Sequence, residues 1–421
     1  MFFNITKLVE ISFTSNFNTQ NITNMYNMFS TCESLVSVDL FNFNTEKVED
    51  MGHMFDNCKS MKYVNLSSFD TSKVTKMNYM FRHCSSLESL NLSTFNTTKV
   101  GSMMGMFSGC ESLKSINQNF DGKNVIFIME MFENCYSLTS LDLKNFNAKR
   151  VEHMYSTFLN CYSLTSIDLS SFDTRYIKDM QLLFSGCKSL KYIDVLDFDT
   201  SYVTSMSAMF QNCNSLTSID IKSFSSENLV DASYMFAFCY SLTSIDFTNF
   251  NRIPSNIEKM FSSCSSLKSI DFSSCNTGYV REINYMFYNC SSLEYINLPK
   301  LNLDFVRDMK YMFFNCYSLK SINISASYTK SLKNIEKMFL NCSSLTSVVL
   351  SNFDVVDVES MDEMFYNCSN LIYVDISSFK SSLNQILLFN SLPSHGEIVV
   401  KTNFYNKIEN QIPENWNKTF K

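Results

Sequence analysis

Glycine and proline are scarce in this sequence, with 8 and 4 residues among 421. Linkers and hinges are usually rich in these residues, so their shortage argues against several separately folded domains joined by flexible segments. Hydrophobic residues make up 45% of the chain, including 39 phenylalanines and 25 methionines. This apolar content excludes a disordered chain and predicts a long, continuous core.

Several functional signals are missing as well. The net charge of −7 is small for this length, and Lys and Arg are dispersed along the chain, which argues against a nucleic-acid partner. No apolar run approaches the roughly 18 residues that a membrane-spanning helix needs. Residues 1–10 lack the charged and apolar regions of a secretory signal peptide. The sequence as given therefore predicts no transmembrane segment and no leader.

The fifteen cysteines follow a fixed period. Apart from Cys275, each lies 25 or 26 residues after the previous one, from Cys32 to Cys368. Phe stands three positions before the cysteine in all fourteen repeats, and Leu stands three positions after it in thirteen. The consensus is MFxNCxSLxSIDLSxFxTxxVxxM. A period of this length is typical of a solenoid, in which each repeat buries its apolar face against its neighbours.

Two local periodicities lie inside each repeat. Residues 35–40 end in the apolar–polar alternation of a short strand with one buried face. Residues 48–58 carry apolar side chains at spacings of three, four and three, which predicts one face of a short helix. Between them, the Phe-Asn-Thr of residues 43–45 offers a polar N-cap. We therefore expect an α/β repeat, with a parallel β-sheet on the concave side and short helices on the convex side.

The motifs MF, NC, SLxSIDLSxFDT and VxxM at a 26-residue period resemble the BspA-like leucine-rich repeats of bacterial surface proteins, a class also grouped as a domain of unknown function. The resemblance covers about residues 8–384. It implies a leucine-rich-repeat solenoid and a non-enzymatic, adhesion-like protein, at the cell surface or secreted, that binds other proteins. The alternative from a different class is an intracellular scaffold for protein–protein interaction, located in the cytoplasm, whose cysteines stay reduced.

Three regions are expected along the chain. Residues 1–31 trace a degenerate first turn, which is either a minimal cap or the end of a truncated coil. Residues 32–383 form the solenoid of fourteen repeats, and residues 384–421 form a C-terminal cap. Within the cap, residues 397–401 are predicted to pair as a last strand, and the apolar spacing of residues 404–412 predicts a helical segment over the open end.

The cysteine column is predicted to be core. Side chains in a parallel ladder point the same way, so neighbouring cysteines do not converge as a disulfide requires, and buried Cys behaves as a small hydrophobe. Cys275 falls where most repeats have Phe, which places it in the core too. The four histidines occupy different repeat positions and form no zinc motif. No repeated position supplies a catalytic triad, a phosphate loop or paired carboxylates, so we expect no enzyme, metal or cofactor.

The outward positions of the strands, which should line the concave face of the solenoid, are the candidate partner-binding surface. Five positions after the cysteine, four repeats carry tyrosine: Tyr63, Tyr192, Tyr295 and Tyr373. Seven positions after it, six successive repeats carry aspartate: Asp142, Asp168, Asp194, Asp220, Asp246 and Asp271. We call these ten residues the predicted stripe.

Two interpretations of the predicted stripe remain open. It is a solvated ladder that serves solubility and regular hydrogen bonding, or it is a protein-binding surface that recruits a cation or a basic partner. In the first case, lysines four positions after the cysteine are expected to neutralise part of the row. These are Lys62, Lys114, Lys191, Lys268 and Lys320.

Overall fold

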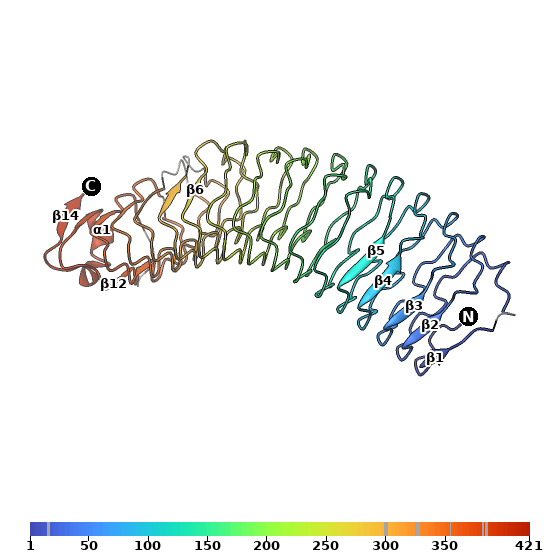
Figure 1. The fold of residues 1–421 in the computed structure, drawn as a ribbon. Helices are drawn as coiled ribbons and strands as arrows, with labels where there is room; N and C mark the ends of the chain where they lie inside the picture. The colour runs from blue at the N-terminus through green and yellow to red at the C-terminus, as the bar shows by residue number, and fades with distance from the viewer. Residues whose placement is uncertain (15–16, 299–301, 325–328, 354, 381–382, 384–385) are drawn as a thin grey trace. The chain divides into compact units, whose positions relative to one another are not determined.

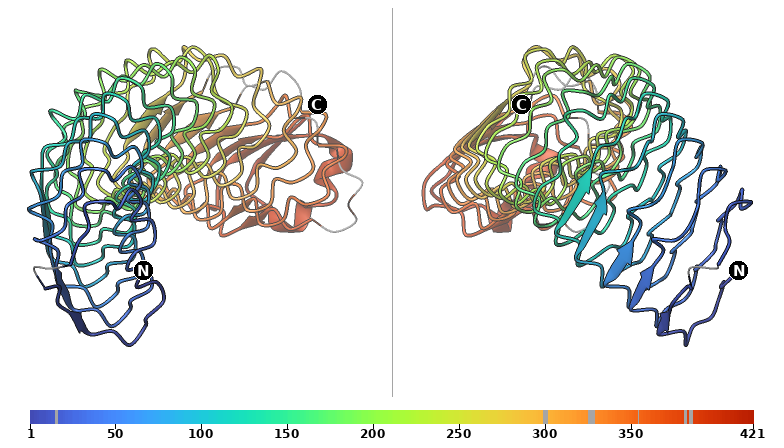
Figure 2. Two further views of the ribbon diagram at one scale, coloured as in Figure 1. Left: turned by 90° about the vertical axis from the view of Figure 1, so that its right-hand side faces the viewer. Right: turned by 45° about the vertical axis from the view of Figure 1, so that its right-hand side comes forward.

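The structure is a computed structural model, and it describes all residues except 15–16, 299–301, 325–328, 354, 381–382 and 384–385. Internal contacts divide the chain into two units, Met1–Val203 and Thr204–Lys421. Within each unit, equivalent residues of successive coils lie side by side in parallel register (Figures 1 and 2). The predicted parallel solenoid of leucine-rich-repeat type is therefore confirmed.

The first unit contains five short strands, labelled in Figure 1. They are β1 (Glu10–Ile11), β2 (Ser37–Asp39), β3 (Tyr63–Asn65), β4 (Ser89–Leu92) and β5 (Ser115–Gln118). Strands β1, β2 and β3 form one parallel sheet in that order, and β4 pairs with β5. Strands β2 to β5 lie where the alternation in the sequence predicts them.

The described residues of the second unit form nine strands and two short helical segments. The strands are β6 (Ser269–Asp271), β7 (Tyr295–Asn297), β8 (Ser321–Asn323), β9 (Ser347–Val349), β10 (Phe365–Tyr366), β11 (Tyr373–Asp375), β12 (Phe389–Asn390), β13 (Glu397–Val400) and β14 (Asn417–Phe420). The helical segments are α1 (Thr402–Tyr405) and the 3-10 turn η1 (Glu409–Gln411). Strands β8, β9, β11, β13 and β14 form one parallel sheet in that order, while β6 pairs with β7 and β10 pairs with β12.

Burial follows the predicted alternation even where the strands stop. In β4, Ser89 and Asn91 are exposed while the leucines between and after them are buried. Between β5 and β6, where every residue is described, the same alternation continues but no segment forms a regular strand. In that stretch the link from Thr165 N–H to the Thr139 carbonyl is long, at 3.4 Å. The alternation therefore fixes which side chains are buried, and the sheet itself is discontinuous.

The predicted convex-side helices are wrong. Within residues 51–58, the Cys58 N–H donates to the Phe55 carbonyl three residues back (3.1 Å), which closes a four-residue turn. The Asn57 N–H instead donates to the Arg82 carbonyl of the next coil (2.8 Å). An α-helix would direct both donors along its own axis. Both helical segments lie in the C-terminal region, so the described part of the repeats contains none.

The reason is a left-handed backbone at two positions of each coil. The residue before each repeat cysteine has a positive φ, as does the residue four before that; in the second coil these are Asn57 (φ 61°) and His53 (φ 54°). Asn and Gly tolerate this conformation better than other residues. Eight of the fourteen residues before the cysteine are Asn and two are Gly. Successive four-residue turns give apolar spacings close to those of a helix, which is why the pattern misled.

A stack of phenylalanines runs through the core. Phe29 and Phe55 lie with their ring centroids 5.5 Å apart and their planes 2° apart, and the stack continues through the repeats of each unit. Phe2 extends the stack at one end (5.2 Å from Phe29), and Phe389 extends it at the other (5.2 Å from Phe365). Aromatic pairs of this kind contribute about 0.5–1.5 kcal/mol each beyond their burial.

The cysteine column is buried beside this stack. All fifteen cysteines are buried free thiols, which confirms their predicted place in the core. The Cys84 Sγ–H donates to the Phe55 carbonyl of the preceding coil (3.2 Å), and this contact recurs along the column. Burial raises the pKa of Cys110 and Cys187 to about 12. These thiols are therefore protonated and inaccessible at neutral pH.

The C-terminal region adds more than the predicted last strand. The strand predicted at residues 397–401 is confirmed as β13, but β14 pairs with it in parallel and lies further out. The predicted helical segment is shorter than its apolar spacing indicates, since α1 spans four residues and η1 three. The only tryptophan, Trp416, is buried and donates its indole N–H to the Pro393 carbonyl (2.8 Å).

Substitution at Asn212 (φ 59°) tests the left-handed turns. We expect Asn212→Gly to leave stability nearly unchanged, because glycine adopts positive φ without strain. Asn212→Val is expected to lower the free energy of unfolding by about 1–2 kcal/mol, because its branched Cβ clashes in this conformation. Urea unfolding followed by circular dichroism would measure both variants, and equal stability of the two would contradict the turn geometry.

Candidate functional site

The tyrosines of the predicted stripe face outward but lie apart. Tyr63, Tyr192 and Tyr295 are 59%, 55% and 54% exposed, and Tyr373 is half-buried. In the first unit, four coils with serine at the same position separate Tyr63 from Tyr192. In the second unit, two such coils separate Tyr295 from Tyr373. The fold therefore brings no two of these tyrosines together.

The aspartates do lie in adjacent coils. The first acidic row, in the first unit, consists of Asp142, Asp168 and Asp194, all exposed. The second acidic row, in the second unit, consists of Asp220, Asp246 and Asp271, of which the last two are exposed and the first is half-buried. Tyr192 lies two residues before Asp194, and alternation places both on the outward face of the same coil.

Each aspartate also holds the backbone of its own coil. In the first acidic row, the Oδ1 atom of each aspartate accepts a hydrogen bond from the backbone N–H two residues later. The donors are Lys144 for Asp142 (3.0 Å), Ser170 for Asp168 (2.9 Å) and Leu196 for Asp194 (3.1 Å). The second row does the same at 2.8–3.1 Å. Such Asx turns require an Asp or Asn side chain. This local need explains why thirteen of the fourteen repeats have one of these two residues here.

These hydrogen bonds also favour the charged carboxylate. The pKa values of Asp168, Asp246 and Asp271 lie below the usual range. The largest cause is a hydrogen bond from the side chain two residues later, which belongs to Ser170, Thr248 and Ser273 respectively. The backbone N–H of that same residue is the second cause. Hydrogen bonds to the ionised form lower a carboxyl pKa. All three groups are ionised at neutral pH.

The expected neutralisation by lysines differs from the observed one. Lys114 and Lys320 pair with Glu88 and Glu294, carboxylates at their own repeat position, at 2.7 and 2.5 Å. In the second acidic row, Lys222 instead lies 3.8 Å from both Asp220 and Asp246. Within the described residues, the first acidic row forms no ion pair. Its three carboxylates are therefore exposed, and the charge of Lys144 acts on Asp168 without a direct ion pair.

The space between these carboxylates is small. The hollow bounded by Asp168 and Asp194 holds about 30 Å³, which is the volume of a single water molecule. A search of the described residues for three or more His, Cys, Asp or Glu side chains able to hold a metal ion found no such group. The first acidic row can thus make surface contacts, and it has no cavity for an organic ligand.

Two charged clusters on the turn side were missed from the sequence. In the first unit, the guanidinium of Arg82 donates to both oxygens of the buried Asp56 (2.9 and 2.7 Å), and His53 Nδ1 lies 2.8 Å from the same carboxylate. In the second unit, the Lys259 ammonium lies 4.9 Å from the ring of Tyr234 and bonds its hydroxyl (2.7 Å). Asp56 and Arg82 occupy the same position in adjacent repeats, which is the signal that could have revealed the pair.

Comparison with protein families identifies the repeat. Four overlapping stretches, residues 1–64, 53–167, 153–270 and 255–379, match the family described as "Mycoplasma protein of unknown function, DUF285". The chain belongs to this family. The BspA-like leucine-rich repeat inferred from the motifs is thereby confirmed. No protein of curated function matches the sequence of this DUF285 chain.

Two bacterial proteins are among the solved structures to which the chain is similar. A leucine-rich repeat protein from Bacteroides ovatus shares 18% identity, with a TM-score of 0.45 over 94% of this chain and 86% of its own. A leucine rich cell surface protein from Faecalibacterium prausnitzii shares 21% identity, with a TM-score of 0.42 over 73% of this chain and 77% of its own.

In the described part of the DUF285 chain, no helix has the length and apolarity to cross a membrane.

The Asx turns make a prediction about Asp168. Because its pKa is lowered in the folded chain, the stability that its carboxylate contributes is present above the unfolded pKa of about 3.9 and is lost as pH falls through the folded value. At pH 7, Asp168→Asn should keep the turn but lose the contribution of the charge, so it should lower the melting temperature slightly, whereas Asp168→Ala loses the turn as well and should lower it further. NMR titration of the Asp168 carboxyl and thermal unfolding would check both expectations, and a carboxyl pKa above 4 would contradict them.

Proposed function

We propose that this DUF285 chain is a non-enzymatic, adhesion-like protein at the cell surface or secreted, and that it binds a partner protein through the outward face of its strands. The supporting observation is the first acidic row, in which three exposed carboxylates in adjacent coils have no ion-pair partner among the described residues. Adjacent coils of a parallel stack lie about 4.8 Å apart, a spacing that the long side chains of a basic segment of a partner can span.

Energetics favour such a partner. Two like charges about 5 Å apart repel by about 1 kcal/mol in water, and a basic partner relieves this repulsion on binding. Tyr192 stands on the same coil as Asp194 and is more than half exposed. A tyrosine side chain supplies large contact area at little cost in conformational entropy. The first acidic row and Tyr192 together form the proposed contact surface, with Asp220, Asp246, Asp271 and the other stripe tyrosines as secondary candidates in their own units.

The negative charges of the first acidic row can be removed while the Asx turns are kept. We predict that the triple variant Asp142→Asn, Asp168→Asn and Asp194→Asn keeps all three Asx turns, since an Asn oxygen accepts the same hydrogen bonds. Its affinity for a ten-residue lysine-rich peptide should fall about tenfold, because each exposed pair contributes roughly 0.5 kcal/mol. Fluorescence anisotropy at low and at physiological salt would measure the affinity.

A matched control exists in the same unit. Asp70, Asp121 and Asp199 accept the N–H two residues later at 2.8, 3.0 and 2.9 Å, and they lie after the strand segment, at the position that follows the buried phenylalanine. Their triple Asn variant changes the net charge equally and should bind the peptide like the unaltered chain. Equal weakening in both variants, or none in the first, would contradict the proposed contact surface.

Location separates the proposal from its alternative, an intracellular scaffold. Reduced thiols cannot decide, because the cysteines are buried and protonated and would stay reduced in either compartment. We expect an antibody against the native chain to label intact, unpermeabilised cells of the source organism, and external protease to remove that signal. Labelling that requires permeabilisation would favour the scaffold.

A further inference from the structure

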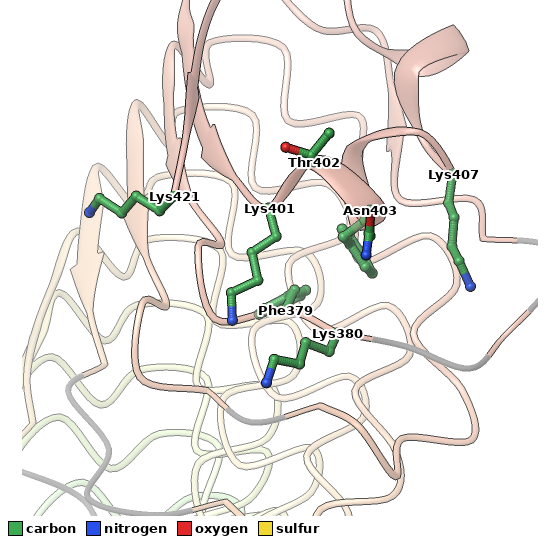
Figure 3. Close-up of a pocket in the computed structure, with 8 residues that line it drawn as sticks. Phe379, Lys380, Lys401, Thr402, Asn403, Lys407 and Lys421 are labelled. Atoms are coloured by element: carbon green, nitrogen blue, oxygen red, sulfur yellow. The ribbon is translucent and has the colours of Figure 1, made fainter.

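A basic pocket of about 510 Å³ lies in the C-terminal part of the second unit (Figure 3). Four of its eight described lining residues are lysines, and none of the eight is acidic. The eight are Phe379, Lys380, Lys401, Thr402, Asn403, Phe404, Lys407 and Lys421. In a chain with a net charge of −7, such a concentration of positive charge is unusual. The volume is within the range of small-molecule binding sites.

The parallel sheet gathers these lysines. Strands β11, β13 and β14 are neighbours, and Asp375 of β11 pairs with Val399 of β13. Because the strands are parallel, their carboxyl ends meet at one edge of the sheet. Lys401 directly follows β13 and Lys421 directly follows β14. The chain leaving β11 reaches Lys380 after a short turn, so three strands contribute one lysine each.

Two of the four lysines leave their ammonium groups without a partner among the described residues. The Lys407 ammonium donates to the Leu383 carbonyl (2.7 Å), and the Lys421 ammonium lies 3.8 Å from the Asp375 carboxylate. Among the described residues, the ammonium groups of Lys380 and Lys401 have no hydrogen-bond or ion-pair partner. Figure 3 shows both side chains extending past Phe379 toward the same space, while Lys421 points to the left of the view and Lys407 points downward on its right.

Two buried phenylalanines and two exposed polar residues complete the pocket lining. The rings of Phe379 and Phe404 meet edge to face with centroids 5.6 Å apart, and both residues are buried. Thr402 and Asn403, which are exposed at the pocket, add a hydroxyl and an amide donor. The apolar stems of the lysines suit the body of an organic ligand, and the donors suit acceptor oxygens.

We propose that this pocket binds a phosphate or sulfate ester of a small polar molecule, such as a phosphorylated sugar. Lysine ammonium groups bind phosphate oxygens as point charges. The pocket is larger than a bare anion requires, so the body of the ester occupies the remaining space beside the apolar stems of the lysines. This site is independent of the proposed protein contact at the first acidic row.

Isothermal titration calorimetry of the full chain with glucose 6-phosphate, inorganic phosphate and glucose tests the proposal. Saturable binding of the sugar phosphate is expected, with weaker binding of phosphate alone and an affinity that falls as salt rises. Lys380→Gln with Lys401→Gln should weaken binding about a hundredfold, since each charged hydrogen bond accounts for roughly a tenfold change.

Lys418→Gln is the matched control, because Lys418 lies on β14 and its ammonium bonds the Glu414 carbonyl (2.7 Å) outside the pocket. Fluorescence of Trp416 reports whether each variant keeps the folded C-terminal region. Binding to vesicles that contain a phosphoinositide is compared with binding to phosphatidylcholine vesicles. Binding to the phosphoinositide vesicles alone would identify a lipid headgroup, rather than a free ester, as the source of the phosphate. Absence of saturable binding to every phosphorylated probe, or equal loss in Lys418→Gln and the double variant, would overturn the proposal.

Discussion

The whole fold depends on one constraint: every buried side chain must pack between its own counterparts in the coils before and after it. Parallel backbone hydrogen bonds, such as the one from Asn57 to Arg82, hold equivalent positions in register. The phenylalanine rings then stack face to face at 5.2–5.8 Å within each unit. A residue of a different size at one level would leave a gap or a clash with two neighbours, which is why the core residues repeat so strictly.

The same constraint shapes the turn side of each coil. A helix would direct its N–H groups along its own axis, whereas the observed turns let N–H groups such as that of Asn57 reach the next coil. Their cost is a left-handed backbone at positions such as Asn57 and His53. Side chains beside these positions face their counterparts in adjacent coils, so that Asp56 meets Arg82 and Tyr285 stacks on Tyr311 at 4.9 Å. Interactions on this side are therefore set by residues 25 or 26 positions apart.

The aspartates of the acidic rows have two roles, and replacing them by alanine would remove both at once. Asp168 and Asp194 hold their own turns through Oδ1 and present a negative charge to the solvent. Loss of the side chain would disturb both the backbone and the charge. An Asn replacement separates the two roles, because it preserves the acceptor and removes the charge. The basic pocket differs, because its lysines hold no turn and several strand ends contribute to it.

The sequence by itself determined the repeat, its period, the buried columns and the outward positions of the predicted stripe. These follow from one-dimensional periodicity, since a side chain at a given position of the 26-residue unit meets the same environment in every coil. The turns, the broken sheet, the addition of β14 and the pocket of Lys380 and Lys401 were decided only by the tertiary structure. Apolar spacings of three and four fit both helices and four-residue turns, and backbone hydrogen bonding between coils chooses between them. The pocket's lysines are up to 41 residues apart and share no repeat position, so only strand pairing brings them to one edge.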